Sequence, residues 1–168
     1  FSQIRRSLIV TSGALNYTQT GGTVTVGGKN PNTTRAAFEV LNTGSKFNMS
    51  NGTLIIANSI ASTSPYDFYL NASTSTVTGG TIQFGLASIT PNQTLFYFQS
   101  TNILNNLVLE ATTNVRASQQ VYTVQLKGNL TIGGTSSYYS ANGLDVYIGG
   151  NLINNNTEAA SNDITLGG

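Results

Sequence analysis

The sequence predicts an all-β fold, a parallel β-helix of about six or seven rungs, in which short strands stack along one axis. Two observations predict it. A short phrase, made of a turn followed by Gly-Thr or Asn-Leu and an alternating apolar strand, recurs along the chain. Period-two strand patterns fill most of the remainder, and helix patterns are nearly missing. A unit that recurs roughly every 20 to 50 residues indicates a solenoid, because one unit cannot bury its apolar face without a neighbour.

The repeated phrase supplies one strand of each predicted rung. Its copies are separated by 30, 28, 26, 23 and 22 residues, counted at Thr23, Thr53, Thr81, Leu107, Leu130 and Leu152. The inward side of this strand is expected to form one apolar column, made of Val26, Ile56, Phe84, Leu109 and Ile132. At the corners, the side-chain amides of Asn129 and Asn151 are expected to bond to one another, as in stacked side-chain ladders.

Three strands are predicted in each of the longer repeats. In one repeat they are Phe38–Asn42, Lys46–Ser50 and Thr53–Ala57, and one turn later they are Tyr66–Asn71, Thr74–Thr78 and Thr81–Gly85. Gly and Asn between the strands tolerate the positive φ that tight corners require. The best helix candidate, Thr34–Leu41, is short and is interpreted as a loop followed by a strand. An antiparallel β-sandwich is the alternative fold, because its strands are also short and evenly spaced.

The length suits one domain with a core, and residues 1–168 are predicted to form a single β-solenoid segment. Asn, Thr, Ser and Gly account for 79 of these residues, yet the regular apolar alternation argues against disorder. The chain stops on Leu166-Gly167-Gly168, within what looks like a further repeat. We therefore expect a fragment of a longer repeat protein.

The composition limits the partners and cofactors of the chain. Seven basic and six acidic residues give a net charge of +1, which offers no electrostatic footprint for nucleic acid. No apolar run approaches the roughly 20 residues of a membrane helix, so membrane insertion is not expected. The absence of cysteine and histidine excludes disulfides and the usual zinc ligands. We expect neither a metal nor a cofactor.

Two segments, Lys46–Ile56 and Leu126–Gly134, resemble the repeats of very large secreted surface proteins of the Bacteroidota. Those proteins include gliding-type adhesins and other cargo of the type IX secretion pathway. More loosely, the segments resemble filamentous haemagglutinins and autotransporter passengers, and the resemblance covers most of residues 8–168. It implies a right-handed β-helix, an extracellular or cell-surface location, and a role in adhesion or passive structure. Surface glycans and other cell-surface or secretion proteins are the partners it implies, and it carries over no catalytic residue.

The acidic residues do not suggest catalysis. They are scattered along the chain, with no two within four residues of each other, as Glu39, Asp67, Glu110, Asp145, Glu158 and Asp163. Paired carboxylates that hydrolyse glycosides must lie a few ångströms apart. We therefore interpret these residues as solubilising charge on the outward face. The oxygen-rich segments Asn154–Glu158 and Ser161–Asp163 match no calcium loop and are interpreted as polar connections.

Three tyrosines are candidates for stacking against sugar rings. If the flanking apolar residues point inward, Tyr69, Tyr97 and Tyr147 point outward. The competing interpretation is that they are ordinary strand residues covered by a loop such as Ala57–Pro65. An ice-binding threonine array is disfavoured, because Thr23-Val24-Thr25 and Thr76-Val77-Thr78 do not recur at a constant place in the rungs.

The predicted function is that of a non-enzymatic structural or adhesive segment, a stalk, spacer or adhesin of a secreted cell-surface protein. The alternative is a carbohydrate-binding or polysaccharide-cleaving β-helix protein. The sparse charge and the missing histidines favour the first function. A groove that brought the three tyrosines together beside Asp67 and Asp145 would favour the second.

Overall fold

The computed structural model describes residues 2–4, 12–27, 35–59, 66–88, 95–110, 115–133, 137–156 and 164–165. Within these ranges the only regular elements are strands. They are β1 (Ser2–Ile4), β2 (Asn16–Val26), β3 (Phe38–Val40), β4 (Lys46–Ile56), β5 (Phe68–Leu70), β6 (Thr74–Val77), β7 (Thr81–Phe84), β8 (Leu95–Ser100), β9 (Asn106–Leu109), β10 (Arg116–Gln119), β11 (Val124–Leu126), β12 (Leu130–Ile132), β13 (Tyr138–Ser140), β14 (Val146–Ile148), β15 (Leu152–Asn154) and β16 (Ile164–Thr165).

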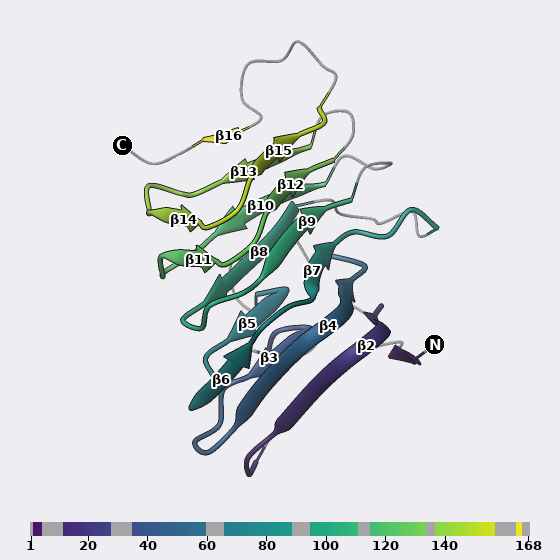
Figure 1. Cartoon of the computed structure of the whole chain (residues 1–168), viewed down its shortest axis with the longest axis vertical. Coiled ribbons are helices and arrows are strands. Elements are labelled where there is room, and N and C mark those ends of the chain that lie inside the picture. Colours follow the sequence, from purple (N-terminus) through teal and green to yellow (C-terminus); the bar gives the residue numbers. More distant parts are fainter. Residues whose placement is uncertain are drawn as a thin grey trace.

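The strands form three stacked sheets, and every pairing in the described part of the chain is parallel (Figure 1). An eight-stranded sheet runs β1-β2-β4-β7-β9-β12-β15, with β6 also paired to β4. A six-stranded sheet runs β16-β13-β10-β8-β5-β3, and β11 pairs with β14 in a two-stranded sheet. From β3 onward the chain passes back and forth between the sheets. This arrangement is consistent with a parallel β-helix and disagrees with the antiparallel sandwich.

The predicted correspondence between the two long repeats is confirmed. Phe38 pairs with Phe68, Lys46 with Thr74, and Thr53 with Thr81, so the first, second and third predicted strands of one repeat pair with those of the next. One expectation is wrong: the second and third predicted strands form the single 11-residue strand β4, which bends without a break. The bend is made at Gly52, whose φ of 87° is one that glycine adopts without strain.

The counting of the repeated phrase needs one correction. Thr81 pairs with Asn106, and Ile82 pairs with Leu107, so the interval there is 25 residues instead of 26. In this repeat one corner is shortened. Ten residues, 71–80, connect β5 to β7, whereas only five, 101–105, connect β8 to β9. The shorter connection has no equivalent of β6.

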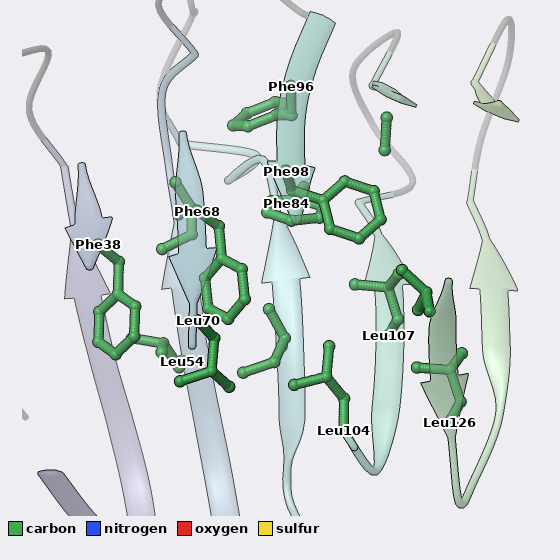
Figure 2. Packing of buried hydrophobic residues seen from close by; sticks show 14 of the residues in the cluster. Phe38, Leu54, Phe68, Leu70, Phe84, Phe96, Phe98, Leu104, Leu107 and Leu126 are labelled. Atoms are coloured by element: carbon green, nitrogen blue, oxygen red, sulfur yellow. The ribbon is translucent and has the colours of Figure 1, made fainter. Parts of the chain in front are cut away.

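The predicted inward column is confirmed by the register of the eight-stranded sheet. Successive pairings place the five residues of the column in one row, and each is almost fully buried: Val26, Ile56, Phe84, Leu109 and Ile132. A second row, of Phe38, Phe68 and Phe98, comes from the facing six-stranded sheet. Figure 2 shows Phe38, Phe68 and Phe98 in succession along the core, with Phe98 beside Phe84. The Phe84 ring lies 5.1 Å from that of Phe98, measured between centroids.

Two buried glutamines complete the core where the chain turns. Tyr17 donates its hydroxyl proton to Gln19 Oε1 at 2.7 Å, and Gln19 Nε2 donates to the carbonyl of Thr53 at 3.1 Å. The same arrangement recurs farther along, where the Tyr139 hydroxyl donates to Gln119 Oε1. Gln119 stands next to Phe98 in its row, so a polar residue replaces a phenylalanine there. Burial raises the pKa of both tyrosines, which keeps both hydroxyls protonated as donors.

An asparagine ladder runs along another corner. Asn106 Oδ1 accepts the backbone N–H of Asn129 at 2.9 Å, and Asn129 Oδ1 accepts that of Asn151 at 2.8 Å. We predicted bonds between side-chain amides, and the structure forms side-chain-to-backbone bonds instead. A glycine precedes each of the later asparagines because a Cβ on Gly128 would lie 2.1 Å from Asn106 Oδ1. Steric exclusion therefore explains the Gly-Asn-Leu form of the repeated phrase.

Phe84→Ala is expected to lower the free energy of unfolding by about 3–5 kcal/mol, the usual range for a buried phenylalanine. The ring contacts Phe68, Phe96 and Phe98, so its removal leaves a cavity between the two large sheets. Tyr147→Ala is the control, because Tyr147 is 59% exposed and its loss should change stability by no more than about 0.5 kcal/mol. Denaturant unfolding followed by circular dichroism measures both. If Phe84→Ala left the free energy of unfolding unchanged and Tyr147→Ala lowered it strongly, the assignment of inner and outer faces would be wrong.

Candidate functional site

The outer face of the six-stranded sheet carries two of the three tyrosines that were singled out. In β5, Phe68 and Leu70 are fully buried and Tyr69 between them is partly exposed. In β8, Tyr97 is partly exposed between the buried Phe96 and Phe98. The predicted alternation is therefore observed in both strands, because successive side chains of a strand point to opposite faces.

The two tyrosines are not aligned with each other. Tyr69 pairs with Gln99, and Tyr97 pairs with Ser118 on the opposite neighbour. Tyr147 lies on a different sheet, in β14, where it pairs with Gln125 of β11. Tyr147 is well exposed, as expected, but the structure does not bring the three rings onto one surface.

A different group of aromatic residues forms on the outer face, and we call Tyr66, Tyr69 and Tyr122 the tyrosine cluster. The rings of Tyr66 and Tyr69 meet edge to face, with centroids 5.5 Å apart. The Tyr122 side chain lies close enough to Tyr69 to affect its ionisation, although Tyr122 lies just beyond β10, two strands away from β5. Burial, and then the neighbouring Tyr122, raise the pKa of Tyr69 above its ordinary value. Strand parity does not identify Tyr122 as a member of the cluster, because it groups Tyr122 with the inward Val124 and Leu126.

A buried amide lies in the row of Tyr69. Gln99 pairs with Tyr69 in the register of β5 and β8 and is only 2% exposed. Its Oε1 has no hydrogen-bond partner among the described residues. An unpaired buried carbonyl oxygen costs roughly 1–3 kcal/mol, so this atom is an acceptor that a hydrogen-bond donor would stabilise.

Two acidic residues of this sheet are buried, which corrects the expectation that they are solubilising charges. Glu39, next to Tyr69 in the register, forms an ion pair with Arg35, and its Oε2 accepts the N–H of Ala36 at 3.0 Å. Asp67 is fully buried. The expectation failed because each carboxylate finds a partner close by in the chain or the sheet, which offsets the cost of burial.

Asp67 joins three segments of the chain. Its Oδ2 accepts the Tyr97 N–H at 2.9 Å and the Ser59 hydroxyl at 3.1 Å. Its backbone N–H also donates to the carbonyl of Tyr97 at 2.7 Å. Asp145, by contrast, is exposed as predicted. Asp67 and Asp145 are therefore in unlike surroundings, and the role of Asp67 in this arrangement is to hold β5 against β8.

Threonine rows occur on the outer face of the eight-stranded sheet. Thr23, Thr53 and Thr81 are in register, but the row continues with Asn106. The parallel row through Thr25 continues with Ile55 in β4. The interruptions agree with the expectation that no uniform threonine array exists.

The described residues contain no group of three or more histidine, cysteine or acidic side chains that would hold a metal ion. Of the two segments considered for calcium, only residues 154–156 lie within the described ranges. Those ranges also include no helix of the length and apolar character that crossing a membrane requires. Comparison of the chain with protein-family models, curated proteins and solved structures finds no match.

Asp67→Ala is expected to lower the free energy of unfolding by about 1–3 kcal/mol, because it removes the acceptor of two buried hydrogen bonds. Asp67→Asn should cost less, since the amide oxygen still accepts. Asp145→Ala is the matched control and should change stability by no more than about 0.5 kcal/mol, because its side chain is exposed. Thermal and denaturant unfolding measure all three. Equal effects of the two alanine variants would contradict the structural role of Asp67.

Proposed function

We propose that this chain is a non-enzymatic structural segment, a stalk or spacer of a secreted cell-surface protein, whose strands continue as a closed, right-handed parallel β-helix. The observation that carries the proposal is the continuous parallel pairing of the eight-stranded sheet from β1 to β15. Each repeat is joined to the next by backbone hydrogen bonds and by rows of buried side chains. Each repeat of such a stack is stabilised by its interfaces with the two neighbouring repeats. Bending the stack would disrupt these interfaces, so we expect it to be stiff.

The outer surface suits a spacer exposed to solvent. The chain is rich in Asn, Thr and Ser and carries few charges, so it has little electrostatic attraction for polyanions. The resemblance of Lys46–Ile56 and Leu126–Gly134 to repeats of Bacteroidota surface proteins supports an extracellular location and export by a type IX pathway. In this proposal, surface glycans or other cell-surface proteins are the partners.

The tyrosine cluster supports a second candidate function, carbohydrate binding. Tyr66, Tyr69 and Tyr122 combine ring faces with hydroxyl groups, as sugar-binding surfaces do. The free Oε1 of Gln99 adds an acceptor in the row of Tyr69. Cleavage of a polysaccharide is less well supported, because the carboxylates of Glu39 and Asp67 are engaged by protein partners.

The spacer proposal predicts mechanical resistance along the stack. Handles attached at Ser12 and Asn156 would allow the chain to be pulled in a single-molecule experiment, and we expect distinct rupture events instead of gradual extension at low force. Phe84→Ala should lower the rupture force, because it removes contacts between the facing sheets. Tyr147→Ala should leave the force unchanged. Gradual extension of the unmodified chain at low force would contradict a mechanical role.

The non-enzymatic proposal predicts no turnover of neutral or acidic polysaccharides, measured by release of reducing ends or unsaturated products. The Asp67→Asn and Asp145→Asn variants, each of which lacks one carboxylate, are assayed in parallel to measure the background release of product. Turnover that survives purification and is lost in either variant would overturn the proposal. In the same preparations, oligosaccharides that change tyrosine fluorescence in the unmodified chain, but not in Tyr122→Ala, would establish the second candidate function instead.

A further inference from the structure

Among the described strands, β6 pairs with a neighbour along one side only. It pairs with β4, while the eight-stranded sheet continues from β4 to β7. Thr74 donates its N–H to the carbonyl of Ser45, and Thr78 donates to that of Met49. In a parallel ladder, alternate residues bond to the same neighbour. Ser75 and Val77 therefore turn their backbone N–H and C=O groups toward the opposite, open side.

The open side exists because the next repeat is shorter. The five residues 101–105 replace the ten residues 71–80, and their one bridge, from Leu104 to Leu126, is made to β11 and not to β6. Figure 1 shows β11 and β14 farther along the stack, on the side of the molecule where β6 lies. The row of strands at this corner is thus interrupted after β6.

Side chains of the following repeats substitute for part of the missing strand. Asn102 bonds to both backbone groups of Ala72, accepting its N–H at 2.7 Å and donating to its carbonyl at 3.2 Å. Lys127 Nζ donates to the carbonyl of Val77 at 2.6 Å. Between these two contacts, three backbone groups have no partner among the described residues: the N–H and C=O of Ser75 and the N–H of Val77.

A cavity of about 260 Å³ lies against these groups. It is lined by Ser75, Val77, Thr101, Asn102, Ile103 and Lys127. Ile103 is 40% exposed and the Lys127 side chain is exposed, so the cavity offers an apolar wall and a positive charge at one end.

We propose that this edge binds the C-terminal residues of an extended peptide, which adds to β6 as a parallel strand. In that register, the carbonyl of the residue two before the last accepts the Ser75 N–H. The N–H of the last residue donates to the carbonyl of Ser75. The C-terminal carboxylate then accepts the N–H of Val77 and lies beside Lys127. Edge-strand addition and carboxylate capture are both established modes of peptide recognition.

The Lys127 contact explains why the bound strand ends opposite Val77. A longer parallel strand would next donate an N–H to the carbonyl of Val77, which Lys127 already occupies. A second donor would have to share that carbonyl oxygen and would bring no negative charge, whereas a carboxylate accepts from Val77 and is attracted by the ammonium group. The groove therefore favours a chain terminus over an internal segment, and this inference is independent of the proposed spacer function.

The test is a titration of the ¹⁵N-labelled full chain, followed by amide NMR, with the N-acetylated peptide Thr-Val-Thr-Val bearing a free carboxylate. We expect shifts at the amides of Ser75 and Val77. The C-terminal amide of the same peptide lacks the negative charge, so we expect its affinity to be lower by a factor of about ten or more. Lys127→Gln, which keeps a donor for the carbonyl of Val77, should weaken the acid by about tenfold and leave the amide unchanged.

Lys46→Gln is the matched control. Lys46 is exposed on the adjacent strand β4 and does not line the cavity, so its variant should bind both peptides as the unmodified chain does. Equal affinity for the acid and the amide would overturn the proposal, as would shifts that avoid Ser75 and Val77. Shifts at these two amides that grow with protein concentration, without peptide, would also overturn it, because the edge would then pair with a second copy of the chain.

Discussion

The in-register parallel pairing of strands that are 21 to 30 residues apart in sequence is the interaction on which the structure depends. Thr23 pairs with Thr53 and Leu95 with Arg116, at the two extremes of this spacing. Closing such long loops is costly in chain entropy. The cost is offset because each pairing aligns a whole row of inward side chains with the rows already buried. A slip of one residue would turn all of them to the solvent, so the hydrophobic rows and the hydrogen-bond register enforce each other.

The polar residues of the interior follow from the same constraint. A coiled chain must turn, and its corners contain backbone carbonyls that no neighbouring strand satisfies. Gln19 and Gln119 are buried at such places, and their amides donate to carbonyls of Thr53 and Asp145 across neighbouring segments. Each glutamine oxygen is in turn satisfied by a tyrosine hydroxyl. The corners are therefore specified by short polar networks, in a core that is otherwise apolar.

The sequence predicts the rows well because burial in a strand depends on parity alone. The inward position of Phe84 and the partial exposure of Tyr69 both follow from alternation. The failures concern contacts that parity does not describe. Asp67 is buried because Ser59, from the preceding segment, reaches it, and Tyr122 joins Tyr69 across an intervening strand. These contacts depend on how loops return to the sheets, which strand periodicity does not encode.

The change of repeat length along the chain has a consequence for folding. In an array of identical repeats, a strand that skips its neighbour and pairs with the next one finds an equivalent partner, and the skipped unit is extruded as a loop. Here the 11-residue strand β4 pairs with β2 over nine residues, with register shifts before Thr23, whereas β9 offers only four residues for pairing. The rows are also individually distinct, since Ile56 meets Phe84 and Phe84 meets Leu109. Each repeat thus matches only its own neighbours, which disfavours mispaired intermediates during assembly of the stack.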